Sequence, residues 1–106
     1  MAEPQGGPLG MVEWLKYILG GTMYFVYILQ SKRCRRFYIG VTQDLKERLE
    51  NHNNGYTKST KPYGPWELIY IEEYESKYKA YKREYYLKHP KGWLEKRRIV
   101  EEYGDK

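Results

Sequence analysis

A chain of 106 residues has room for one domain, and its hydrophobic fraction of 41% suffices for a modest core. The net charge of +5 and the pI of about 9.2 make nucleic acid the first partner to consider. The single cysteine, Cys34, excludes an internal disulfide and favours a reducing, cytoplasmic location, and no apolar stretch reaches the roughly 20 residues of a membrane span.

The start of the chain differs in composition from the rest. Residues 1–10 are rich in glycine and proline, which is typical of a linker, and residues 11–19 could form a short helix ended by Gly20 and Gly21. We therefore predict a linker or N-terminal extension over residues 1–22 and a single domain over residues 23–103.

Two strands should open this domain. Residues 24–29 and 37–41 are aromatic and β-branched, and the basic connection 32–36 has the length of a hairpin loop. The strands should therefore pair antiparallel, with a cationic tip. Tyr27 and Tyr38 could face each other across this hairpin if the register allows, although tyrosines in strands most often serve in packing.

A helix should follow the hairpin. Asp44, with Glu47 three residues later, resembles a capping box, and Leu45 and Leu49 mark the buried stripe. The remaining expected elements are a loop, a strand and two helices, over residues 55–65, 66–71, 76–87 and 93–103. The prediction is an α+β domain in which a small three-stranded, mainly antiparallel sheet is flanked by helices.

Arg48 and His52 lie four residues apart, so they share one face of the first predicted helix, beside the leucine stripe. Each has a plain structural explanation, because an arginine stem can cover apolar surface and a histidine near a helix C-terminus is favoured by the dipole. Together with the tyrosines, they could also bind a phosphodiester and move protons around it.

Glu84 falls on the inward stripe of the second predicted helix, together with Ala80 and Leu87. A carboxylate in that position is costly unless it is paired or binds a metal. The spacing leaves two alternatives open. One is a salt bridge to Arg48 or a lysine, and the other is a ligand for magnesium, which one or two carboxylates hold together with water and phosphate oxygens.

In this order the motifs resemble a GIY-YIG nuclease domain of the small stand-alone bacterial type, related to the N-terminal domain of the excision-repair nuclease. Phe25-Val26-Tyr27 stands at the first name motif and Tyr38-Ile39-Gly40 at the second. Phe25 replaces the first glycine of the family, and Val41 stands where some excision-repair relatives have a lysine. The resemblance covers about residues 23–90 and includes the helix over 41–53, the strand over 66–70 and the later Ala80 and Arg83-Glu84.

The resemblance implies metal-dependent hydrolysis of a DNA phosphodiester. Tyr27 would be the base that activates water, Tyr38 would orient water or phosphate, and Arg48 would stabilise charge on the phosphate. His52 would assist proton transfer or bind phosphate, and Glu84 would hold one Mg²⁺ or Mn²⁺ ion. Because an ordinary phenol with a pKa near 10 is a poor base, Tyr27 should lie close to Arg48 and to the ion.

DNA is the expected partner, in branched or single-stranded form, and a protein partner or a homodimer would be compatible with so small a domain. Gly40 would permit close approach of strand and substrate. We assign DNA contacts to the basic residues of the hairpin tip, the first helix and the following loop, namely Lys32, Arg33, Arg35, Arg36, Lys46, Lys58 and Lys61.

Two other functions are compatible with the sequence. One is a nucleic-acid-binding module without turnover, in which aromatic rings stack on bases while lysines contact phosphates. The other is a protein-interaction domain, and it alone predicts that Tyr27, Arg48 and Glu84 lie far apart.

Overall fold

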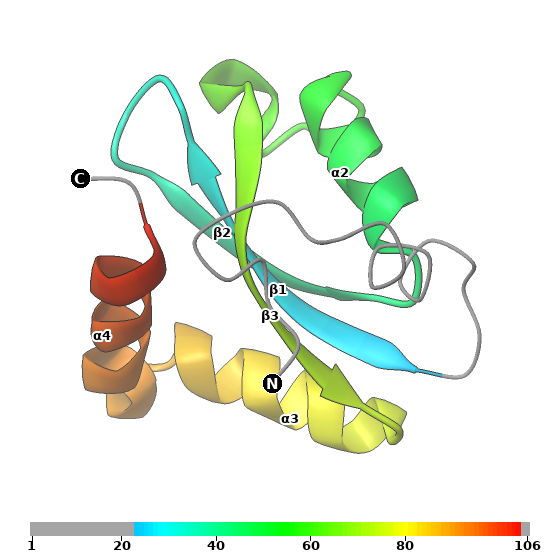
Figure 1. Ribbon diagram of the computed structural model, residues 1–106, viewed down its shortest axis with the longest axis vertical. Coiled ribbons are helices and arrows are strands. Elements are labelled where there is room, and N and C mark those ends of the chain that lie inside the picture. Colours follow the sequence, from blue (N-terminus) through cyan, green and yellow to red (C-terminus); the bar gives the residue numbers. More distant parts are fainter. Residues whose placement is uncertain (1–22, 105–106) are drawn as a thin grey trace.

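The computed structural model describes residues 23–104, which form a three-stranded antiparallel sheet with helices on both faces (Figure 1). The strands are β1 (Tyr24–Ser31), β2 (Phe37–Thr42) and β3 (Trp66–Tyr74). Strand β1 lies at the centre and pairs with both neighbours. This confirms the predicted α+β architecture. The linker and helix predicted within residues 1–22 lie outside the described residues.

The helices are α2 (Leu45–Asn53), α3 (Lys77–Lys88) and α4 (Trp93–Tyr103), with short 3₁₀ turns η1 (Lys61–Tyr63) and η2 (Pro90–Gly92). Helix α2 covers one face of the sheet, while α3 and α4 cover the other (Figure 1). Within residues 23–104, no helix combines the length and the apolar character that a membrane crossing requires.

Strand β1 is apolar along most of its length because both of its faces are buried. Val26 and Ile28 point to one face, where they pack with Leu87 of α3. Tyr27 points to the opposite face and packs with Leu45 of α2. The alternation of side chains along the strand thus places Tyr27 on the α2 side.

Side-chain caps begin the helices α2 and α3. The Asp44 carboxylate accepts a hydrogen bond from the N–H of Glu47 at the start of α2, and the Ser76 hydroxyl accepts one from Lys79 at the start of α3. Just after the end of α2, Gly55 adopts a φ of 77°, a conformation that favours glycine. Local signals therefore set these boundaries close to the predicted ones.

Strand β3 extends beyond its predicted end at Ile71 to Tyr74. Glu72 and its neighbour interrupt the apolar pattern, yet the pairing with β1 continues until Tyr74 lies opposite Tyr24. The strand tolerates Glu72 because the carboxylate accepts hydrogen bonds from Arg83 of α3. The prediction stopped too early because it could not include this long-range partner.

Candidate active site

Tyr27 is enclosed in the middle of β1, with 2% of its surface exposed. Its hydroxyl lies 3.1 Å from Nε2 of His52, which comes from the last turn of α2. The tyrosine of the first motif and the histidine of the helix, 25 residues apart, therefore meet as a buried hydrogen-bonded pair.

Gly40 of β2 lies opposite Tyr27 and makes room for its ring. A Cβ added to Gly40 would lie 2.5 Å from the Tyr27 hydroxyl oxygen and 2.7 Å from Cζ. The resemblance implied that this glycine lets substrate approach the strand, but the phenol of Tyr27 already fills the space. The absent side chain thus serves the placement of Tyr27 itself.

Replacing Gly40 with alanine is expected to displace Tyr27 and to destabilise the fold. Because the ring is enclosed, we expect a loss of roughly 1–3 kcal/mol in the free energy of unfolding, which urea denaturation measures. Gly64→Ala is the matched control, because the nearest atom to its added Cβ would be 3.8 Å away. Equal losses in the two variants would contradict the packing role of Gly40.

Tyr38 lies diagonally across the hairpin from Tyr27 and not directly opposite it. Its partner in the strand register is Leu29, and the centroids of the two tyrosine rings are 6.1 Å apart. The Tyr38 ring is closer to His52, at a centroid distance of 4.6 Å. Both hairpin tyrosines and the histidine therefore form one aromatic group under α2.

His52 is almost completely enclosed, with 1% of its surface exposed, and both of its ring nitrogens have partners. Nδ1 lies 2.9 Å from the hydroxyl oxygen of Thr60. Burial, assisted by the positive charge of Arg48, lowers the pKa of His52 to about 4. The imidazole is therefore neutral at pH 7, so attraction of a charged histidine to the helix dipole does not explain its position.

Arg48 is half-buried, one helical turn before His52. Burial raises the pKa of Tyr27 well above its usual value and nearby Tyr38 raises it further, while the charge of Arg48 opposes the rise. Arg48 forms no ion pair with any carboxylate in the part of the chain that the structure describes. Its guanidinium therefore adds positive charge, without a protein counter-ion there, beside the phenol and the imidazole.

Glu84 approaches the aromatic group from α3. Its side chain is 19% exposed and pairs with Lys88 of the next turn at 3.0 Å, so the salt bridge to a lysine is present. The Lys88 ammonium also lies 5.7 Å from the centroid of the Tyr38 ring, at the β2 edge of the sheet. The charge of Glu84 contributes to the raised pKa of Tyr27, so the carboxylate is within electrostatic reach of the phenol.

Glu84 suits a divalent ion that needs only one protein ligand. Among residues 23–104, no three histidine, cysteine, aspartate or glutamate side chains come together as a metal cage. Mg²⁺ commonly keeps several waters and uses one or two carboxylates with substrate phosphates. A partly exposed carboxylate whose partner, Lys88, is itself 49% exposed fits that donor set.

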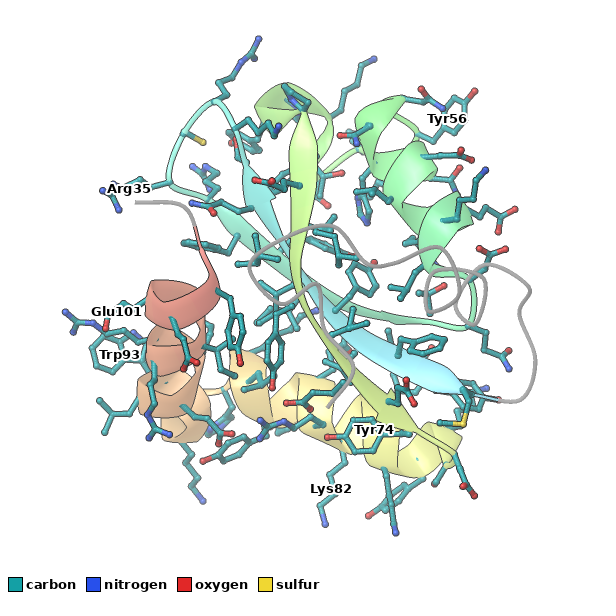
Figure 2. The ribbon with its side chains drawn as sticks, viewed as in Figure 1. Arg35, Tyr56, Tyr74, Lys82, Trp93 and Glu101 are labelled. Carbon is teal, nitrogen blue, oxygen red and sulfur yellow. The ribbon has the colours of Figure 1, made fainter. Side chains whose placement is uncertain are left out.

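Most of the basic residues assigned to DNA lie on two neighbouring loops at one end of the sheet, namely Lys32, Arg33, Arg35, Arg36, Lys58 and Lys61. Arg33 donates a hydrogen bond of 2.9 Å to the Pro62 carbonyl, which ties the hairpin tip to the second loop. Figure 2 shows Arg35 projecting outward from the hairpin. Lys46 does not join them, because it lies in the first turn of α2, which follows the other end of β2, and pairs with Glu50 at 2.9 Å.

The model of the GIY-YIG catalytic domain matches residues 23–98 of the sequence. The chain belongs to the GIY-YIG family. The match extends into α4, beyond the range of about 23–90 over which the motifs resemble this nuclease family.

Several similar proteins carry the name UPF0213. The protein from Clostridium perfringens is 45% identical over 67 residues, which cover 62% of this chain and 71% of the relative. The protein from Limosilactobacillus reuteri is 40% identical over 70 residues, with the same coverage of 62% and 71%. A UPF0213 protein from Bacillus halodurans, solved by NMR in solution, is 30% identical and matches with a TM-score of 0.48 over 77% of this chain and 87% of that one.

Two residues beside the GIY-YIG motifs were not among the predicted site residues. Thr60 is 2% exposed and contacts His52 from the loop before η1, where one threonine among polar residues gives no recognisable pattern. Lys88 follows Glu84 by four residues, and that helical spacing is the signal that could have paired them.

Proposed function

We propose that this GIY-YIG protein is a DNA endonuclease that hydrolyses a phosphodiester with the help of a divalent metal ion. The observation that supports the proposal most is the buried contact of Tyr27 with His52, with Tyr38 beside them and the charges of Arg48 and Glu84 within electrostatic reach. Two strands and two helices contribute to this one group. A protein-interaction domain would have no need to gather these residues.

In the proposed reaction, Tyr27 takes a proton from the attacking water. Its phenol is neutral in the free protein because burial raises its pKa, so it must first release its own proton. Nε2 of His52, at 3.1 Å, is the acceptor within reach, and because the pKa of His52 is lowered, the transfer requires the positive charge of Arg48 to stabilise the phenolate that forms. Arg48 binds the phosphate and stabilises the charge that develops on its oxygens, while Tyr38 orients the water or the phosphate.

Glu84 is the proposed ligand of Mg²⁺ or Mn²⁺. When bound, such an ion lowers the pKa of a water molecule and stabilises the leaving oxygen. Lys88 would exchange its contact with the Glu84 carboxylate for one with a phosphate, since its ammonium is half-exposed.

The two basic loops are the proposed DNA-binding surface. Lysine and arginine side chains contact phosphates without reading the base sequence, so they position the substrate. Tyr38 lies at the start of β2, just after the hairpin tip, and His52 lies at the end of α2, just before the second loop. DNA held by these loops would therefore pass beside the candidate active site.

A cleavage panel tests the proposal. Labelled duplex, flap, junction and single-stranded DNA are incubated with and without Mg²⁺ or Mn²⁺, and we expect cleavage of at least one substrate only with metal. Glu84→Gln keeps the size of the side chain and removes its charge. It should lower the rate by about 10²–10³-fold, if losing the metal ligand costs roughly 3–4 kcal/mol of transition-state stabilisation.

Glu67→Gln is the matched control, because Glu67 is exposed on β3 and should be dispensable. Equal cleavage by Glu84→Gln and the wild type would remove the metal-ligand role. DNA binding that persists without metal, together with no cleavage of any substrate, would favour the non-catalytic binding module instead.

A further inference from the structure

A chain of buried polar groups continues beyond Tyr27 and His52 into the loop that follows α2. Nδ1 of His52 lies 2.9 Å from Oγ1 of Thr60, and this oxygen lies 3.2 Å from the backbone carbonyl oxygen of Thr57. Tyr27, His52 and Thr60 are each at most 2% exposed. Water therefore has little access to these hydrogen bonds, and the direction of each one must be set by the protein.

The carbonyl oxygen at the end of the chain decides these directions. A carbonyl can only accept, so the contact of Oγ1 of Thr60 with the Thr57 oxygen, which also accepts the N–H groups of Thr60 and Lys61, is a hydrogen bond only when the hydroxyl hydrogen points to that oxygen. If the hydrogen pointed to Nδ1 of His52 instead, a lone pair of Oγ1 would face the Thr57 oxygen at 3.2 Å, and the two oxygens would repel each other. Oγ1 then accepts a hydrogen bond from Nδ1–H of His52, which leaves the lone pair of Nε2 directed at the Tyr27 hydroxyl.

We propose that Thr60 is a positioning residue that holds neutral His52 with its proton on Nδ1, so that Nε2 accepts the proton of Tyr27. The inference rests on the proposed nuclease function for its role in the reaction. The proton leaves the phenol oxygen and binds Nε2, which converts a neutral pair into a phenolate and an imidazolium with no change in total charge. The imidazolium keeps its Nδ1–H bond to Thr60 throughout.

Thr60 is itself fixed in place. Its amide donates to the carbonyl of Thr57 at 3.1 Å, and its own carbonyl accepts a hydrogen bond of 2.9 Å from the indole of Trp66. The side-chain amide of Asn53 bonds the backbone of Trp66, so the end of α2, this loop and the start of β3 are tied together. A rigid hydroxyl is what holding one imidazole tautomer requires.

NMR of the ¹⁵N-histidine-labelled protein tests the tautomer at pH 8, above the ordinary pKa of imidazole. The ring-nitrogen shifts distinguish a protonated nitrogen from an unprotonated one. His89 is the internal reference, because its Nδ1 accepts the N–H of Lys91 at 3.1 Å and its proton must therefore be on Nε2. We expect the opposite assignment, Nδ1–H, for His52.

Thr60→Val and Thr60→Ser form a matched pair, since valine keeps the shape and serine keeps the hydroxyl. Thr60→Ser should retain the Nδ1–H form, whereas Thr60→Val should shift the ratio of the tautomers toward Nε2–H by about tenfold, as expected when one hydrogen bond is lost. Unchanged His89 signals verify the fold. Nε2–H in the wild type, or an unaltered His52 tautomer in Thr60→Val, would overturn the inference.

Cleavage kinetics supply the second readout. Thr60→Val should lower kcat about 10–100-fold with little change in KM, comparable to the loss of a hydrogen bond that orients a functional histidine. Thr60→Ser, which keeps the hydroxyl, should retain most of the wild-type kcat. A change in KM alone would contradict the positioning role. Because the tautomer is measured without DNA, failure of the wild type to cleave any substrate would refute the nuclease function and leave the tautomer result standing.

Discussion

Replacing Tyr27 with phenylalanine is expected to lower the rate of DNA cleavage by about 10²–10⁴-fold, the contribution typical of a positioned proton acceptor. The substitution removes only the hydroxyl, and the ring keeps its place over Gly40. DNA affinity should change little, because the basic loops are untouched. Single-turnover cleavage measures the rate, and fluorescence anisotropy of labelled DNA measures binding.

Tyr56→Phe is the matched control for this variant. Tyr56 is 74% exposed and projects outward just after α2 (Figure 2), so its hydroxyl should not affect cleavage. Tyr27→Phe leaves Nε2 of His52 without a partner, which should lower the free energy of unfolding by about 1–3 kcal/mol. A thermal melt establishes that the variant is folded under the assay conditions. Cleavage by folded Tyr27→Phe at the wild-type rate would exclude Tyr27 as the base.

Replacing Glu72 with alanine is expected to destabilise the domain by about 3–5 kcal/mol, a large part of the stability of an ordinary small domain. The Glu72 carboxylate accepts two hydrogen bonds of 2.9 Å from Arg83 and bonds of 2.6 Å from the hydroxyls of Tyr70 and Tyr74. The side chains of Glu72 and Arg83 are 13% and 20% exposed. In Glu72→Ala, the largely buried guanidinium of Arg83 would keep only Glu95 as a carboxylate partner.

Urea denaturation measures this loss, and Glu101→Ala is the matched control. Glu101 pairs with Arg97 at the surface, where the two side chains are 62% and 57% exposed, so its removal should change stability by less than about 1 kcal/mol. Losses of similar size in the two variants would contradict the importance of the buried pair. Because Arg83 precedes Glu84 in α3, loss of this anchor should also lower cleavage.

The contribution of Glu72 should depend on pH in a defined direction. Burial by itself would raise the pKa of Glu72, but hydrogen bonds from Arg83, Tyr70 and Tyr74 outweigh burial and hold the pKa below its ordinary value of 4.5. The folded state therefore binds the proton less readily than the unfolded state does. The stabilisation is complete at neutral pH and is lost as the pH falls below about 4.5, so the gap between the wild type and Glu72→Ala should narrow in acid.

The order and the type of the elements could be predicted from the sequence because their signals are local. The Asp44 and Ser76 caps, the Leu45 stripe and the glycine after α2 each act within one or two helical turns. The family motifs identified Tyr27, Tyr38, Arg48, His52 and Glu84 as candidates, and the fold brings the aromatic members of this set into contact. Their catalytic roles stay predictions that the variants above test.

Only the tertiary structure decided which of many similar side chains are buried and which partners they contact. Among thirteen tyrosines, Tyr27 is enclosed and hydrogen-bonded to His52, while Tyr78 on α3 is 72% exposed. The strand register that puts Gly40 opposite Tyr27, the loop that brings Thr60 to His52 and the pairing of Glu72 with Arg83 all join residues that are distant in the chain. Periodicity and capping describe neighbours within a few residues, whereas burial and hydrogen-bond partners depend on how whole elements pack, so these contacts appear only once the sheet and helices are assembled.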